Sequence, residues 1–165
     1  MTTPVSVERS RAIPVDVPHA FGGTLLLPLP RIFCRRYALL PPIREVRGQI
    51  GTWGEVGQVR TVVTSDGGTM REDLIEVDAP HSFAYRLTDI TGPMRPLVDR
   101  VEGWWEFRPR GTGTLVTWRW TLHPTRLGAP VMPLIARMWR RYAEQALEQL
   151  SELLLGQELP RHVTD

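Results

Sequence analysis

The side chains with the most reactive chemistry are four histidines and a single cysteine, and none of them stands in a recognised reactive motif. The histidines are His19, His81, His123 and His162. No two of them have a metal-binding spacing, and the HExxH, GxSxG and phosphate-loop patterns do not occur. Cys34 lies beside two arginines, which favours a reactive thiol, but a buried and inert thiol is the expectation. The sequence therefore predicts no metal site and no cofactor.

A second set of chemically interesting side chains lies in the segment Thr69 to Val77. Arg71, Glu72 and Asp73 follow one another in a run that otherwise reads as a strand. A carboxylate or guanidinium among apolar side chains suits proton transfer or binding of a carbonyl or enolate, which makes Arg71 and Glu72 the candidates for catalysis. The alternative is that both are exposed neighbours on a solvated strand. The apolar residues of this segment change face part-way along, which predicts a β-bulge.

Four of the six tryptophans lie in GWWEFRPRGTGTLVTWRW, residues 103 to 120. Side chains alternate between the two faces of a strand, so Trp105 shares a face with Gly103 and Phe107, whereas Trp104 points the other way. Beyond the turn, Trp118 and Trp120 share a face with Val116 and Leu122. A slip of one residue in the hairpin would expose three large aromatic rings, so the pattern predicts that Trp105, Trp118 and Trp120 face inward. Trp104 is expected to stack on Arg119 across the hairpin or to mark a contact surface.

These side chains must be positioned by closely spaced strands. Short turns such as Ser65 to Gly68 and Gly111 to Gly113 separate the strand-like segments, which favours an antiparallel meander over βαβ units. The expected strands are 44–47, 56–64, 69–77, 82–89, 100–108 and 114–122, preceded by a first strand at 5–13.

Three helices are expected. Asp16 is placed to cap a short helix that runs to about Leu26, and residues 31–39 form a second short helix. The third runs from about Pro130 to Leu155, because its apolar residues recur every three or four positions, and Gly156 is its expected stop. Met138 and Tyr142 are the residues of this helix that we expect opposite the tryptophans, and Arg140 and Glu144 are spaced to support it as an ion pair.

Composition places the chain among ordinary soluble proteins. A chain of 165 residues suits a single domain over 1–165, with a core at 5–155 and a flexible tail at 156–165. The start of the chain lacks a signal peptide and no apolar run could span a bilayer, so membrane insertion is not expected; with one cysteine, a cytoplasmic location is the simplest. All 20 basic residues are Arg, a bias typical of a GC-rich bacterial genome, and the net charge is only +2. Because the Arg residues are spread among 18 acids, nucleic acid is not an expected partner; a homodimer is left open.

The order of elements, together with two motifs, resembles the START-like superfamily, also called SRPBCC or helix-grip. The motifs are Leu74 to Pro80 leading into Phe83 to Arg86, and Gly103 to Phe107 followed by Gly113 to Trp118. The superfamily includes polyketide cyclases or dehydrases and lipid-transport proteins. The resemblance implies an α+β helix-grip fold, in which a curved antiparallel sheet of six or seven strands wraps around a long C-terminal helix, with two short helices after the first strand.

One helix is too narrow to cover a wide curved sheet, so the inward aromatic residues are expected to border a cavity. The function expected from this arrangement is binding of a small hydrophobic molecule, lipid-like or aromatic, by a carrier or sensor. The residues expected to bind it are Tyr85, Gly103, Trp105, Phe107, Trp118, Trp120, Met138 and Tyr142. Two alternatives stay open: an enzyme of the polyketide cyclase, aromatase or dehydratase type that uses polar residues of the cavity, and a protein-interaction module. Ordinary core packing would also explain the tryptophans.

Overall fold

The computed structural model describes residues 2–158 of the chain. Seven strands form one antiparallel sheet in the order β1-β7-β6-β5-β4-β3-β2. The strands are β1 Val5–Ile13, β2 Ile43–Arg47, β3 Val59–Thr64, β4 Thr69–Asp78, β5 Ser82–Thr88, β6 Val98–Arg110 and β7 Gly113–Pro124. The helices are α1 Val17–Leu26, α2 Leu29–Ile32 and α3 Met132–Glu158, with a 3-10 turn η1 at Ala129–Val131. The predicted α+β helix-grip fold is confirmed.

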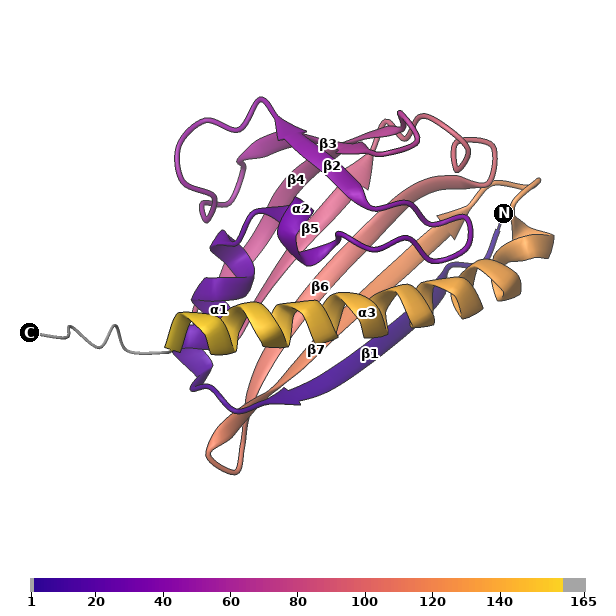
Figure 1. The fold of residues 1–165 in the computed structure, drawn as a ribbon. Coiled ribbons are helices and arrows are strands. Elements are labelled where there is room, and N and C mark those ends of the chain that lie inside the picture. The colour runs from indigo at the N-terminus through magenta and orange to yellow at the C-terminus, as the bar shows by residue number, and fades with distance from the viewer. Residues whose placement is uncertain (1, 159–165) are drawn as a thin grey trace, which may run out of the picture.

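The long helix α3 lies across one face of the sheet, and the two short helices lie on the same side (Figure 1). Helix α3 packs on β1 and α2, while α1 contacts β6, β7 and α3. The core therefore lies between the concave face of the sheet and a layer made of three helices. None of the helices in the described residues is both long enough and apolar enough to span a membrane.

The hairpin of β6 and β7 has the register that the tryptophan pattern predicts. Trp105 lies opposite Trp118, and Gly103 lies opposite Trp120. Trp105 and Trp118 are 3% and 1% exposed, so both face the core. On the outer face, the guanidinium carbon of Arg119 lies 4.6 Å from the centre of the Trp104 ring, which confirms the expected stacking.

The first helix begins where its capping residue predicts. The Asp16 side chain accepts a hydrogen bond of 2.8 Å from the backbone N–H of His19, which satisfies one of the unpaired donors of the first turn. Pro18 stands in that first turn, where a missing N–H has no cost. A hydrogen-bond contact of 3.3 Å between His19 Nε2 and the carbonyl of Leu154 links α1 to α3.

The second helix was predicted wrongly. It covers Leu29–Ile32 rather than residues 31–39. Beyond it, Tyr37 and Leu40 exchange backbone hydrogen bonds of 3.1 and 2.9 Å across a tight turn, with Ala38 at a φ of +50°. The turn satisfies locally the backbone groups that a helix would have paired, so the segment after α2 is free to cross the concave face as a loop.

The end of α3 and one of its ion pairs also differ from expectation. The helix continues through Gly156 to Glu158, so Gly156 is not its stop, and residues 156–158 of the expected tail are helical. The other residues of that tail, 159–165, lie outside the described part of the chain. Glu144 pairs with Arg9 of β1 at 3.1 Å and with Arg141 at 3.2 Å, rather than with Arg140. The Arg9 contact helps to hold α3 against the sheet.

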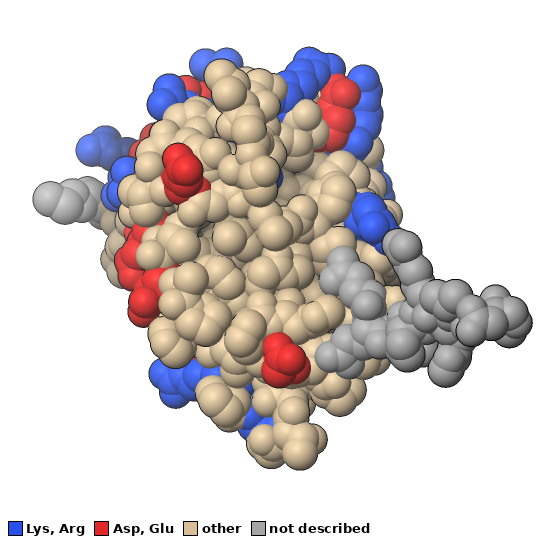
Figure 2. All heavy atoms as spheres, turned by 90° about the vertical axis from the view of Figure 1, so that its left-hand side faces the viewer, with Lys and Arg blue, Asp and Glu red and all other residues tan. Residues whose placement is uncertain are grey.

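Charged side chains are distributed unevenly over the surface. Figure 2 shows the end of the molecule that carries α1 and the C-terminal part of α3. Few charged residues lie near the centre of this face, and basic and acidic side chains lie mixed at its margins. This face therefore presents no concentrated basic patch.

Candidate ligand-binding cavity

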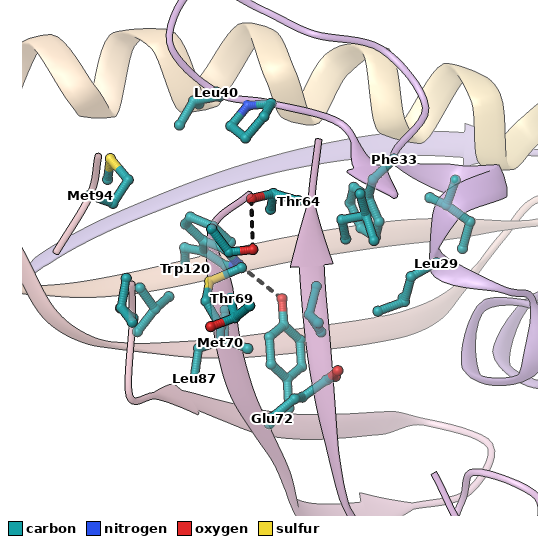
Figure 3. A pocket seen from close by; sticks show the side chains of 18 of the residues that line it. Leu29, Phe33, Leu40, Thr64, Thr69, Met70, Glu72, Leu87, Met94 and Trp120 are labelled. Carbon is teal, nitrogen blue, oxygen red and sulfur yellow. Dashed lines mark hydrogen bonds between the residues drawn. The ribbon is translucent and has the colours of Figure 1, made fainter. Parts of the chain in front are cut away.

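A cavity lies between the concave face of the sheet, helix α2 with the segment after it, and α3. Its walls come from α1, α2 and the segment after it, all strands except β1, the loops that join β2 to β3, β3 to β4 and β5 to β6, and one residue of α3. It offers about 120 Å³ to the centres of water-sized molecules, whereas one water needs roughly 10–15 Å³ on this measure. The core is therefore not completely filled by its own side chains. Figure 3 shows Leu29, Phe33, Met70, Leu87 and Met94 around this space.

Stacked aromatic rings form one wall of the cavity. The rings of Trp105 and Trp118 lie parallel, with centroids 5.1 Å apart and planes at 10°. Phe33, from the segment after α2, packs on Trp118 at 5.0 Å and on Tyr142 of α3 at 6.1 Å. Trp120 meets Trp118 edge to face at 5.6 Å. The chain therefore presents fixed aromatic faces to the space between sheet and helix.

Five of the eight residues expected to bind ligand line the cavity: Tyr85, Trp105, Trp118, Trp120 and Tyr142. The other three lie elsewhere. Phe107 packs edge to face against Phe21 of α1 at 5.5 Å and does not line the cavity. Met138 is buried, but the residue of α3 that lines the cavity is Tyr142.

Gly103 has a different role from the one expected. A Cβ atom at this position would lie 1.9 Å from Cζ of Tyr85. The missing side chain therefore leaves room for the Tyr85 ring rather than for a ligand. Since Tyr85 and Gly103 are paired on β5 and β6, this close packing fixes where the tyrosine ring lies.

The Tyr85 hydroxyl is the centre of a buried hydrogen-bond network. Its oxygen accepts the indole N–H of Trp118 at 2.9 Å and that of Trp120 at 2.8 Å. Figure 3 shows the second of these bonds in the middle of the cavity wall. Burial raises the pKa of the Tyr85 hydroxyl well above its usual value, although both indole bonds oppose the effect. The hydroxyl is therefore protonated throughout the neutral range.

Of the catalytic candidates, Glu72 faces the cavity and Arg71 does not. Glu72 is 4% exposed and lines the cavity, whereas the Arg71 side chain is 51% exposed and pairs with Asp73 at 3.1 Å. The structure therefore splits these neighbours between the two faces of β4. The predicted bulge is confirmed as a register shift between Leu74 and Glu76.

Glu72 forms an ion pair with Arg60, a residue that the sequence analysis did not single out. Arg60 lies directly opposite Glu72 on β3 and donates to both carboxylate oxygens, at 2.8 and 3.3 Å. The guanidinium also donates to Gln49 at 3.0 Å and lies 3.8 Å from the centre of the Trp53 ring. Burial raises the pKa of the Glu72 carboxyl, against the opposing effect of Arg60. The sequence feature that could have indicated this buried arginine is its place between Val59 and Thr61 in the expected strand 56–64.

Cys34, His19, His81 and His123 do not line this cavity, and His162 lies outside the described part of the chain. Cys34 is exposed, which corrects the expectation of a buried thiol. Within residues 2–158, no group of three or more His, Cys, Asp or Glu side chains is arranged to hold a metal ion. The polar residues that line the cavity are therefore Tyr85, Tyr142, Asp66, the Arg60–Glu72 pair and a few threonines such as Thr64 and Thr69.

Residues 5–154 match the model of the family described as polyketide cyclase / dehydrase and lipid transport. The chain belongs to this family. The resemblance to the START-like superfamily drawn from the sequence is thereby confirmed over most of the chain. A comparison with curated proteins gives no match.

Two solved structures share the fold. The crystal structure of Ara h 8.0201 has a TM-score of 0.68 and 15% identity, and the match covers 93% of this chain and 99% of that chain. The crystal structure of TTHA0849 from Thermus thermophilus has a TM-score of 0.70 and 19% identity, with the same coverage of 93% and 99%. At these identities the likeness establishes the helix-grip fold of this family member and says nothing about its ligand.

Proposed function

We propose that this protein binds a small, mainly apolar molecule in the cavity between the sheet and α3. The observation that carries the proposal is the cavity itself, which stays open although three helices cover the concave face. Its walls are mostly apolar and aromatic, as in the binding sites of drug-sized ligands. The family description and the shared fold are compatible with this function.

The arrangement of the walls suits a ligand with a ring. The stacked pair of Trp105 and Trp118 offers aromatic surface, and Phe33, packed on Trp118, extends this wall towards Tyr142. Met70 and Met94 also line the cavity, and their flexible thioether side chains can adapt to ligands of different outline. A carrier or a sensor would both use such a site.

Native mass spectrometry of freshly purified protein, followed by extraction and identification of any bound compound, tests the proposal. Val62→Phe fills the cavity from β3, so it should abolish the co-purified mass. Val63→Phe is the matched control, because Val63 is a neighbouring buried valine that does not line the cavity. If tryptophan fluorescence and calorimetry show no binding of apolar ring compounds by the folded wild type, the proposal is wrong.

A second candidate function is catalysis on a carbonyl compound, and the position of Glu72 favours it. Its buried carboxyl, with a raised pKa, shares the cavity with the Tyr85 hydroxyl. Such a pair can take a proton from the carbon beside a carbonyl while a hydrogen bond stabilises the resulting enolate. Two hydrogen bonds from Arg60 hold the carboxylate in place, which weakens it as a base.

Deuterium exchange of the protons beside the carbonyl of 1-tetralone tests this second function by NMR. An active base gives an exchange rate that rises with added protein and falls to background in Glu72→Gln. Asp73→Asn, which removes the neighbouring carboxylate paired with Arg71 on the outer face, should leave the rate unchanged. Equal exchange rates with and without the wild-type protein would rule out this catalytic function.

The protein-interaction alternative depended on an exposed aromatic cluster around Trp104. Trp104 is half-buried and covered by the Arg119 guanidinium, and its neighbours across the sheet are Ala84 and Arg119. No second aromatic ring therefore adjoins it on the paired strands. The outer face does not support this alternative.

A further inference from the structure

The hydroxyl group of Tyr85 accepts hydrogen bonds but has a proton that it does not donate within the protein. Its oxygen accepts two indole N–H groups, from Trp118 at 2.9 Å and Trp120 at 2.8 Å. An indole nitrogen can only donate, so the direction of both bonds is fixed, and together they occupy the two lone pairs of the phenolic oxygen. The phenolic proton is not used in either bond.

No acceptor within the described residues takes this proton. Tyr85 makes no hydrogen bond other than the two from the indoles. Glu72 lines the same cavity, but no hydrogen bond joins it to Tyr85, and its carboxylate oxygens accept from Arg60. Tyr85 is 7% exposed and lines the cavity, so bulk water does not readily replace the missing acceptor. A buried donor without a partner is unfavourable unless the cavity content supplies one.

The donor cannot turn away from the cavity. The Tyr85 ring lies against Gly103, where even a Cβ atom would collide with it. Trp118, which holds the oxygen, is stacked on Trp105 and packed against Trp139 at 4.9 Å. Two donors on one oxygen also polarise its O–H bond and make it a stronger donor. The network therefore presents a single, fixed and strengthened hydrogen-bond donor to an apolar space.

We propose that the cavity selects apolar molecules that carry a neutral acceptor oxygen, such as a ketone carbonyl, which receives the Tyr85 proton. This inference rests on the proposed ligand-binding function and adds the chemical class of the ligand. Ligands that carry a carboxylate are disfavoured for two reasons. The cationic Arg60 is already paired with Glu72, and the Glu72 carboxylate itself lines the cavity and would repel a second negative charge. Pure hydrocarbons leave the Tyr85 donor without a partner.

Titration of the wild-type protein with three compounds of matched shape tests this selectivity by calorimetry. The probes are 1-tetralone, its hydrocarbon tetralin, and 1,2,3,4-tetrahydro-1-naphthoate. The ketone should bind about three- to tenfold more tightly than tetralin, the gain expected from one hydrogen bond, and the carboxylate should bind most weakly. In the infrared spectrum, the carbonyl band of bound 1-tetralone should lie at lower wavenumber than in an alkane.

Two tyrosine variants give a matched comparison. Tyr85→Phe removes the donor and should equalise the affinities of 1-tetralone and tetralin. Tyr37→Phe is the control, because it removes the hydroxyl of a tyrosine that does not line the cavity. It should keep the preference for the ketone. Circular dichroism checks that both variants fold, and the infrared reading on the wild type needs no variant.

The possible results separate the two proposals. Equal affinities for ketone and hydrocarbon in the wild type, or an unshifted carbonyl band, would overturn the donor inference while leaving ligand binding intact. Binding of none of the three probes would count against the ligand-binding function itself. Tighter binding of the carboxylate than of the ketone would contradict the donor inference and show that the cavity selects negatively charged ligands.

Discussion

At the scale of single residues, burial separates neighbours that look alike in the sequence. Trp104 and Trp105 are adjacent, but one packs under an arginine on the outer face and the other lies in the core. Arg71 and Glu72 are also adjacent, and only Glu72 reaches the cavity. The consequences of substitution should follow this division between the faces.

Trp118→Ala should cost about 3–5 kcal/mol of unfolding free energy, because the ring is fully buried and packs against four other aromatic rings. Trp104→Ala should cost much less, since its ring is half-buried on the outer face. Chemical denaturation of both variants measures the difference. Equal losses would mean that the face assignment is wrong.

Glu72→Gln should destabilise the protein by about 3–5 kcal/mol, because it leaves the Arg60 guanidinium buried without its counter-charge. The double variant Arg60→Met with Glu72→Leu should recover most of that loss, since a well-packed apolar pair needs no desolvation of charge. Urea denaturation gives the three stabilities. A double variant no more stable than Glu72→Gln would contradict the explanation.

At the scale of elements, the strands and helices meet through a few close approaches. Gly103 of β6 lets the Tyr85 ring lie flat on the neighbouring strand, and the turn at 37–40 lets the chain cross the concave face after α2. Tyr85 and Leu40, which take part in these two contacts, both line the cavity. A glycine is therefore required for packing only where a neighbouring residue occupies the space of its missing side chain.

Gly103→Ala should destabilise the protein by about 1–3 kcal/mol, because the new methyl group collides with the Tyr85 ring at 1.9 Å. Gly22→Ala in α1 is the matched change, since a Cβ atom there meets nothing within 4 Å and alanine favours the helix. It should stabilise the protein by about 0.5–1 kcal/mol. Thermal and urea unfolding compare them, and a stabilising Gly103→Ala would refute the packing shown for Tyr85.

At the scale of the whole molecule, folding buries the phenol groups of two tyrosines. Tyr85 lies on the sheet and Tyr142 on α3, and burial raises the pKa of both hydroxyls far above the usual value of about 10. Because the folded values lie above the unfolded one, the stabilisation from these groups is complete below pH 10. It is lost as the pH rises from 10 towards the folded values.

The unfolding free energy should therefore fall as the pH rises above about 10. In the folded protein, the phenolate absorbance of Tyr85 and Tyr142 should be missing in that range and should develop only as the chain unfolds. Parallel absorbance and circular dichroism titrations measure both events. Ionisation of either residue near pH 10 with the fold intact, assigned with the single Tyr→Phe variants, would contradict this expectation.

Periodicity in the sequence was sufficient to predict the sheet, the long helix and the inward face of the tryptophan hairpin. An alternation of two residues assigns each side chain of β6 and β7 to a face, and a slip would expose Trp105, Trp118 and Trp120. The change of face along β4 predicted its bulge, and the preference of aspartate for the N-cap position predicted the Asp16 cap. These features depend on neighbours in the chain or on one pairing, which a sequence displays directly.

Only the tertiary structure decided which inward residues border empty space. Trp105 and Phe107 share a face of β6, but α1 covers Phe107 and leaves Trp105 open to the cavity. The partners Arg60 and Glu72 meet because β3 and β4 pair in one register, and the Tyr85 donor exists because β5 and β7 bring a phenol under two indoles. Periodicity gives the direction of a side chain, but what lies opposite it depends on distant segments that pack there.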